Sequence, residues 1–187
     1  KQAAAPLTTA FERLLDVDNY PFLRSHRINV RPVFPVAMMI EWLGHAALHG
    51  NPGLRFAGLR DLRVLRGIVL RDAAYRIFAK AGRARREGDS IEVDVELCAE
   101  GSAAPHARAV ALLCDRLPEA PSPPVFDELR ELDYERDAAD IYRDVLFHGE
   151  AFQALRKVLG HSPRGMVATA RSAPSPSEWM VSPPRSA

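Results

Sequence analysis

The clearest hydrophobic pattern in the chain is one apolar helical stretch followed by several alternating stretches. Residues 36–48 place apolar side chains on nearly every side of a helix, so we expect other structure to wrap this helix. Pro35 suits its first turn, and the glycines within residues 50–53 end the pattern. Before it, residues 7–17 alternate loosely and fit either an opening strand or a short helix.

Beyond the helix, apolar and polar residues alternate with a period of two, which is typical of half-buried strands. The alternation is clearest at Ile91, Val93, Val95 and Leu97. One buried helix followed by antiparallel strands predicts an α+β protein with the hot-dog fold, in which an antiparallel sheet wraps around a long central helix. The predicted strands are residues 59–70, 74–81, 90–99 and 106–115, with a polar turn at 83–89.

Four prolines after these strands, at residues 118–124, predict a stiff, extended connection. We therefore expect an N-terminal hot dog over residues 1–117, a proline-rich linker over 118–136, and a further part of the chain over 137–187. A helix is expected within this last part, at residues 138–147.

The composition is that of a globular protein with balanced charge. Hydrophobic residues make up 47% of 187 residues, enough to bury a core. Lys and Arg number 25 and Asp and Glu 24, a net charge of +1, so no global electrostatic argument favours nucleic acid or a membrane. No apolar run is long enough for a membrane span, and residues 1–6 lack the apolar core of a secretion signal, so we expect a cytoplasmic protein.

The cysteines and three histidines have ordinary structural interpretations. Cys98 and Cys114 lie in alternating runs without metal-ligand spacing, which predicts two buried free thiols. His45 and His49 have the i, i+4 spacing of a metal site, but no third ligand accompanies them, so a packed or solvated pair is favoured and no metal is expected. His106 lies near a turn, where a surface position is expected.

His26 is the most informative polar residue of the chain. It lies within residues 22–35, which lead directly into the apolar helix. A histidine just before a turn that feeds a buried helix has the geometry of a general base facing the positive end of the helix dipole. That pairing suits chemistry on a thioester carbonyl. On spacing alone, a histidine that caps or packs against a turn is the commoner outcome.

Two segments resemble a known family. His26, Val30 and Pro35, followed by the apolar helix, have the spacing of the His-x-x-x-Gly-x-x-x-x-Pro motif of dehydratase domains in polyketide synthases and polyunsaturated fatty acid synthases. The sequence Phe-His-Gly-Glu-Ala-Phe-Gln at residues 147–153 is similar to the segment that opens the second hot dog of those domains and usually ends Gly-Pro-x-Phe-Gln. Two matches in the correct order, with a proline-rich linker between them, are more specific than either alone. The resemblance implies a double hot dog, in which residues 137–187 are the start of a second hot dog that is incomplete in this chain.

The resemblance implies an enzyme that removes water from a 3-hydroxyacyl thioester on acyl carrier protein and gives a trans-2-enoyl product. His26 is then the base for the α-proton, since an ordinary histidine pKa near 6.5 leaves the ring largely neutral at physiological pH. The backbone N–H of Val30 would polarise the thioester carbonyl. The residues implied to contact substrate or line its cavity are Val30, Pro35, His148, Gly149, Phe152 and Gln153.

The resemblance also implies partners and cofactors. The expected partners are acyl carrier protein and the other domains of a megasynthase. No cofactor is expected beyond the phosphopantetheine arm that carries the substrate. Because a hot dog pairs its exposed sheet edge, we expect a homodimer or a pseudo-dimeric double hot dog. Arg83, Arg85 and Arg86 are favoured as a solvated hairpin tip over a docking patch for the acidic carrier.

The chain departs from the family pattern at several positions. Val30 stands where the motif has glycine, Ser25 stands where aspartate often precedes the histidine, and Glu150 replaces the usual proline. The family's second catalytic residue is an aspartate that follows a Trp-containing stretch, and no Asp follows Trp179 here, so the second half is incomplete or half of the acid/base pair is lost. The alternatives to a dehydratase are a non-catalytic pseudo-dehydratase module of a megasynthase and a product-template-like cyclisation domain.

Overall fold

The computed structural model describes residues 6–70, 74–88, 90–122, 132–175 and 178. Contacts divide the chain into two compact units. The first consists of Lys1–Asp16 and Val33–Glu119, and the second of Val17–Pro32 and Ala120–Ala187. None of the helices in the described ranges combines the length and apolar character that a membrane span requires.

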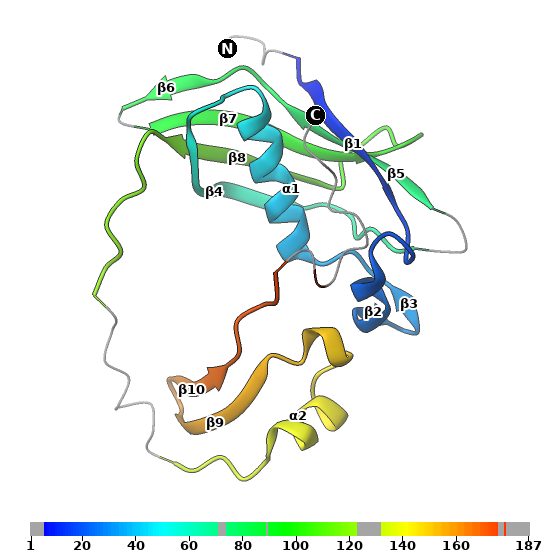
Figure 1. Ribbon diagram of the computed structural model, residues 1–187, viewed down its shortest axis with the longest axis vertical. Coiled ribbons are helices and arrows are strands. Elements are labelled where there is room, and N and C mark those ends of the chain that lie inside the picture. The colour runs from blue at the N-terminus through cyan, green and yellow to red at the C-terminus, as the bar shows by residue number, and fades with distance from the viewer. Residues whose placement is uncertain (1–5, 71–73, 89, 123–131, 176–177, 179–187) are drawn as a thin grey trace. The chain divides into compact units, whose positions relative to one another are not determined.

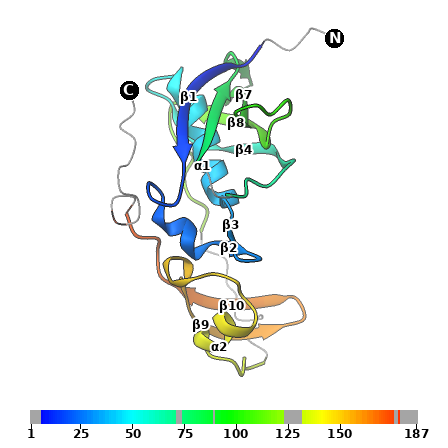
Figure 2. The ribbon, with the colours of Figure 1, turned by 90° about the vertical axis from the view of Figure 1, so that its right-hand side faces the viewer.

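An antiparallel sheet and one helix build the first unit. The sheet order is β1-β5-β7-β8-β4, and the short strand β6 pairs with β7 beyond this path. Helix α1 (Val36–His49) lies along one face of the sheet and contacts β1, β4, β5, β7 and β8 (Figures 1 and 2). This is the predicted hot-dog arrangement. The strands are β1 (Thr8–Leu15), β4 (Arg55–Val64), β5 (Tyr75–Ala81), β6 (Arg85–Glu87), β7 (Ser90–Ala99) and β8 (Ala107–Cys114).

The core of this unit lies between α1 and the sheet. Val93, Val95 and Leu97 of β7 are buried, while Asp94 and Glu96 between them are only half-buried, as a period of two requires. The buried positions of β8 are mostly alanine, which lets the helix approach the sheet closely. The buried residues of α1 are Met39, Trp42, Leu43, Gly44, Ala46 and Ala47.

Helix α1 is less completely wrapped than its sequence predicts. Glu41 and His45 are exposed, and His45 Nε2 lies 3.0 Å from Glu41 Oε1. Val36 is also exposed at the first turn. The helix therefore has one buried face and one polar face, because the sheet covers it from one side. The i, i+4 pairing of His45 is with a carboxylate one turn earlier, and no group of His, Cys, Asp and Glu among the described residues could hold a metal ion.

Most predicted strands are present, with two differences. The loosely alternating start of the chain is strand β1, and β7 has the predicted bounds. Strand β4 begins and ends earlier than predicted, because irregularities between Phe56 and Gly58 and between Arg60 and Arg63 break the period of two. The predicted turn at 83–89 contains strand β6, in which Arg85 lies opposite Glu92 of β7.

The burial of two side chains differs from the prediction. His106 is 5% exposed rather than at the surface, and its Nδ1 lies 3.2 Å from the carbonyl oxygen of Arg66. Both cysteines are free; Cys98 is buried as predicted, but Cys114 is only half-buried. Burial raises the pKa of the Cys98 thiol, which keeps it protonated and unreactive.

Short elements make up the second unit. Helix α2 (Ala138–Asp144) falls where a helix is predicted, and its N-cap Asp137 accepts a hydrogen bond from the backbone N–H of Asp140 at 2.8 Å. Strands β9 (Leu155–Ser162) and β10 (Gly165–Ala170) form an antiparallel hairpin. The remaining elements are the 3-10 helices η1 (Pro21–Ser25) and η3 (Glu150–Phe152) and the strands β2 (Arg27–Ile28) and β3 (Arg31–Pro32).

The two units defined by contacts differ in their boundaries from the predicted domains. The predicted boundaries place the His26 segment in the first hot dog, whereas its contacts group Val17–Pro32 with the C-terminal unit. The reason is a backbone pairing between His26 and His148, which lie far apart in sequence. The predicted hot-dog boundaries at 117 and 137 stay predictions.

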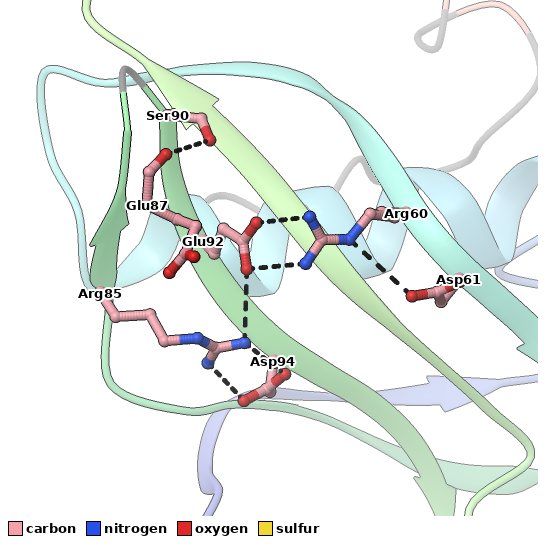
Figure 3. Close-up of polar contacts among 7 residues, drawn as sticks. All are labelled: Arg60, Asp61, Arg85, Glu87, Ser90, Glu92 and Asp94. Carbon is pink, nitrogen blue, oxygen red and sulfur yellow. Dashed lines mark hydrogen bonds and ion pairs between the residues drawn. The ribbon is translucent and has the colours of Figure 1, made fainter.

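A network of charges covers the face of the sheet opposite α1 (Figure 3). Glu92 projects there from β7, and its side chain is only 4% exposed. Arg60 of β4 contacts both carboxylate oxygens, at 2.7 and 2.9 Å, and Arg85 of β6 approaches Oε2 at 3.6 Å. Arg85 also donates two hydrogen bonds to Asp94, which raise the pKa of its guanidinium. The network joins β4, β6 and β7.

We expect Glu92→Gln to lower the free energy of unfolding by about 2 kcal/mol, because the buried acceptor of two arginines loses its charge. Urea denaturation measures this loss. The matched control is Asp61→Asn, since Asp61 is 72% exposed and lies 3.8 Å from Arg60. That change should cost less than about 0.5 kcal/mol. Equal losses in the two variants would contradict the importance of burial at Glu92.

Candidate functional site

The candidate site is built on a backbone pairing within the second unit. His26, which follows η1, forms an antiparallel bridge with His148. The N–H of Gly149 donates to the carbonyl oxygen of Ser25 at 2.7 Å, and the N–H of Ala151 donates to Ser25 Oγ at 3.3 Å. Residues from the two motifs found in the sequence therefore lie side by side.

The pairing needs a glycine at position 149. A Cβ built on Gly149 would lie 2.9 Å from Ser25 Cα and 3.0 Å from Ser25 Cβ. Contacts this short with backbone atoms are not relieved by rotating a side chain. The glycine of the Phe-His-Gly sequence is therefore required for the close approach of the two segments, and it acts through the backbone.

Aromatic rings surround His26. Its imidazole centroid lies 5.2 Å from the ring of Phe147, 5.4 Å from Phe152 and 5.6 Å from His148. Phe152 also packs edge-on against buried Phe22 at 5.9 Å. His26 is itself half-buried. The arrangement gives a candidate base limited freedom to rotate while keeping part of its ring accessible.

The surroundings of His148 perturb its protonation. Burial lowers its pKa below the ordinary histidine value, and a positive charge on His26 lowers it further. Phe147 stacks on its ring at 4.2 Å, with 24° between the planes. The carbonyl oxygen of His148 accepts a hydrogen bond from Gln153 Nε2 at 3.3 Å. Gln153 thus stabilises the loop that carries His148.

Val30 has an unfavourable backbone conformation. It lies with Asn29 in the two-residue turn between β2 and β3, and the φ angles of the two residues are +62° and +48°. Such turns favour Asn-Gly, because positive φ is costly for a residue with a branched Cβ. Val30 is 78% exposed, and its carbonyl oxygen accepts two hydrogen bonds from the Arg27 guanidinium, at 2.6 and 2.9 Å.

The structure groups most, but not all, of the predicted site residues. His26, His148, Gly149, Phe152 and Gln153 lie together in the second unit, and Val30 follows two residues after β2. Pro35 belongs to the first unit, where it is buried and is the N-cap of α1, with its carbonyl oxygen accepting from Met38 and Met39. Its role at the site stays a prediction, as do the roles of the other residues.

Three residues of this site were not predicted to belong to it. Phe147 and Phe22 provide ring contacts, and Ser25 provides the acceptors for the pairing. The signal available for the aromatic residues was their position within the two motifs. Ser25 was noted only as a departure from the motif, and its pairing could not be predicted because its partner lies 126 residues away.

Sequence comparisons identify relatives of one kind. A family model described as the polyketide synthase dehydratase domain matches residues 2–96. A curated relative from Thraustochytrium sp., which is one of the subunits of a polyunsaturated fatty acid synthase, is 24% identical over 172 residues. These are 89% of this chain and 6% of that protein. The two matches confirm the resemblance seen in the motifs.

Solved structures share the fold. The dehydratase domain of a mycocerosic acid synthase-like polyketide synthase matches with a TM-score of 0.64 and 22% identity, over 89% of this chain and 58% of that one. Two inactive variants of the CurK dehydratase, one His to Phe and one Asp to Asn, match with TM-scores of 0.55 and 0.56 and identities of 16% and 17%. Each match covers 79% of this chain and 53% of that one. The chain therefore spans little more than half of these dehydratase domains.

We expect Val30→Gly to raise the free energy of unfolding by about 1 kcal/mol, because glycine adopts positive φ without strain. Thermal and urea denaturation measure the gain. The matched control is Val145→Gly, since Val145 is also exposed but has a φ of −118°. Glycine should destabilise that position through the entropy of the unfolded chain. A loss of stability in both variants would contradict strain at Val30.

Gly149→Ala should lower the free energy of unfolding by about 2 kcal/mol, because the new methyl group meets Ser25 and separates the paired segments. Gly50→Ala is the control, since nothing lies within 4 Å of a Cβ at Gly50. Differential scanning calorimetry compares the two. Equal stability of the two variants would show that the second unit tolerates separation of residues 25 and 149.

Proposed function

Because the chain belongs to the polyketide synthase dehydratase domain family, we propose that it takes part in eliminating water from 3-hydroxyacyl thioesters carried on acyl carrier protein, giving trans-2-enoyl products. Its relatives are domains of synthases that carry out several steps, and the curated relative is far longer than this chain. The expected partners are therefore acyl carrier protein and the other domains of such a synthase. The phosphopantetheine arm of the carrier would present the substrate.

The observation that carries this proposal is the placement of His26. The histidine of the first motif is half-buried, lies against Phe147, His148 and Phe152, and is paired through the backbone with the second motif. A histidine that only caps a turn has no need of such surroundings. A base requires a fixed orientation and a partly desolvated ring, and both features are present.

In the proposed step, the imidazole of His26 accepts the proton from C2 of the thioester. The electron pair of that C–H bond forms the C2=C3 double bond as the C3–O bond breaks, and the hydroxyl leaves as water after it receives a proton. The backbone N–H at Val30 is a candidate donor to the thioester carbonyl, on which negative charge develops. This elimination involves no change of oxidation state, so the proposal needs no redox cofactor.

The proton that leaves with the hydroxyl requires an acid. In the CurK dehydratase, the His-to-Phe and Asp-to-Asn variants are both inactive, which supports a histidine and an aspartate as a working pair in that relative. We propose His26 as the counterpart of the histidine. The Trp-containing stretch that precedes the family's aspartate corresponds here to residues 178–181, of which 179–181 lie outside the described residues.

One observation favours the alternative of a non-catalytic dehydratase module. Val30 replaces the motif glycine and adopts a φ of +62° with its side chain 78% exposed. A branched side chain at this turn restricts the space and the backbone shape next to the base. The two functions differ in one measurable property, because only the enzyme converts a 3-hydroxyacyl thioester.

We expect His26→Gln to lower kcat/KM for dehydration of a 3-hydroxybutyryl thioester by at least about 100-fold, since the general base is lost. Mass spectrometry of the full-length protein's product detects the loss of one water. His161→Gln is the control, because His161 belongs to the same unit but packs edge-on against Tyr134 at 5.8 Å. Dehydration that is insensitive to His26→Gln would refute His26 as the base, and no dehydration by the unaltered protein would favour the non-catalytic module.

A further inference from the structure

His148 lies directly against the proposed base but takes no part in the proton abstraction described above. We propose that His148 is a positioning residue for His26: the two imidazoles form one coupled pair, in which His148 holds the ring of His26 in place and itself stays uncharged. This inference rests on the proposed role of His26. It adds a second histidine, which orients the base and influences whether the base carries a proton.

The geometry of the pair supports a positioning role. The antiparallel bridge sets the two backbones opposite each other, and the ring centroids lie 5.6 Å apart with 54° between their planes. Both rings also contact Phe147 and Phe152, at centroid distances between 4.2 and 6.0 Å. Four rings therefore share one cluster. A change in the orientation of His148 alters the space available to His26.

Electrostatics supports an uncharged His148. Burial lowers its pKa, and a charge on His26 lowers it further, so the state with two imidazolium rings is disfavoured. The proposed step places a proton on His26. A permanently charged neighbour would oppose that proton, whereas a neutral imidazole does not. A neutral His148 is therefore compatible with the proton that the step places on His26.

The other charged groups on the elements around the pair have their own partners or do not act on it. Arg24 is paired with Asp18 at 2.7 Å, and Arg27 donates to the carbonyl oxygen of Val30. Among the described residues, His26 is the charged group that lowers the pKa of His148. Other charged side chains on or near the packed elements are Arg31 in β3, Glu150 in η3 and Arg171, whose guanidinium lies 3.5 Å from the carbonyl oxygen of Glu150.

The first experiment measures the coupling without using activity. Deuterium exchange at the histidine C2–H, followed by peptide mass spectrometry, reports the pKa of each histidine in the full-length protein. We expect the pKa of His148 to lie below the ordinary value and to rise in His26→Gln, where the neighbouring charge is absent. His161→Gln should leave it unchanged. A pKa of His148 that is the same with and without His26 would overturn the proposal.

The second experiment tests positioning through the pH profile of kcat/KM. His148→Phe keeps a ring against Phe147 and Phe152 but cannot be protonated. In the proposal only the pair with both rings unprotonated is active, so at pH values low enough to protonate both rings log kcat/KM of the unaltered protein should fall with a limiting slope of two. The Phe variant has one titrating ring in the cluster and should fall with a slope of one. His148→Ala should lose kcat by at least about tenfold relative to Phe, because the ring contacts that orient His26 are lost.

The outcomes separate this inference from the proposed function. Identical acid slopes in His148→Phe and the unaltered protein, or equal activity of the Ala and Phe variants, would refute His148 as a positioning residue while dehydration itself persists. If neither the unaltered protein nor any variant dehydrates the thioester, the proposed function is refuted. The exchange measurement then still decides whether the two histidines titrate as a pair. Circular dichroism of both variants confirms that the comparison is made on folded protein.

Discussion

The backbone pairing of Ser25 and His26 with His148 and Gly149 is the constraint on which the candidate site depends. It joins segments more than a hundred residues apart, and it exists only because position 149 has no side chain. Once the segments are paired, the backbone limits the positions that the two histidines and the surrounding phenyl rings can adopt. The orientation of the candidate base is therefore a consequence of backbone packing as much as of its own contacts.

In the first unit, the two faces of the sheet are stabilised by different interactions. The face toward α1 is apolar and has small residues on β8, so its stability comes from burial against the helix. The opposite face is polar, and there Glu92 is buried beneath Arg60 and Arg85. A carboxylate in such a position needs both cations, because removing a charge from water is costly unless it is paired. The network also ties the short strand β6 to the sheet.

The departures from the family motif become specific physical features in the structure. Ser25, in place of aspartate, contributes its hydroxyl and carbonyl oxygens to the pairing with residues 149 and 151. Val30, in place of glycine, has a positive φ at the turn where glycine is favoured. Glu150, in place of proline, begins η3 directly after the paired residues 148 and 149. The first and third are accommodated, and the second is strained.

The local elements and the family could be predicted from the residues alone. Helix α1, strand β7 and the two motifs were accessible in this way because periodicity and spacing are properties of neighbouring residues. The ring contact between His26 and His148 and the burial of Glu92 and His106 are seen only in the folded chain. These features depend on which distant segments meet, and no local pattern encodes that. The positive φ of Val30 likewise follows from the turn that joins β2 to β3, since valine alone would not adopt it.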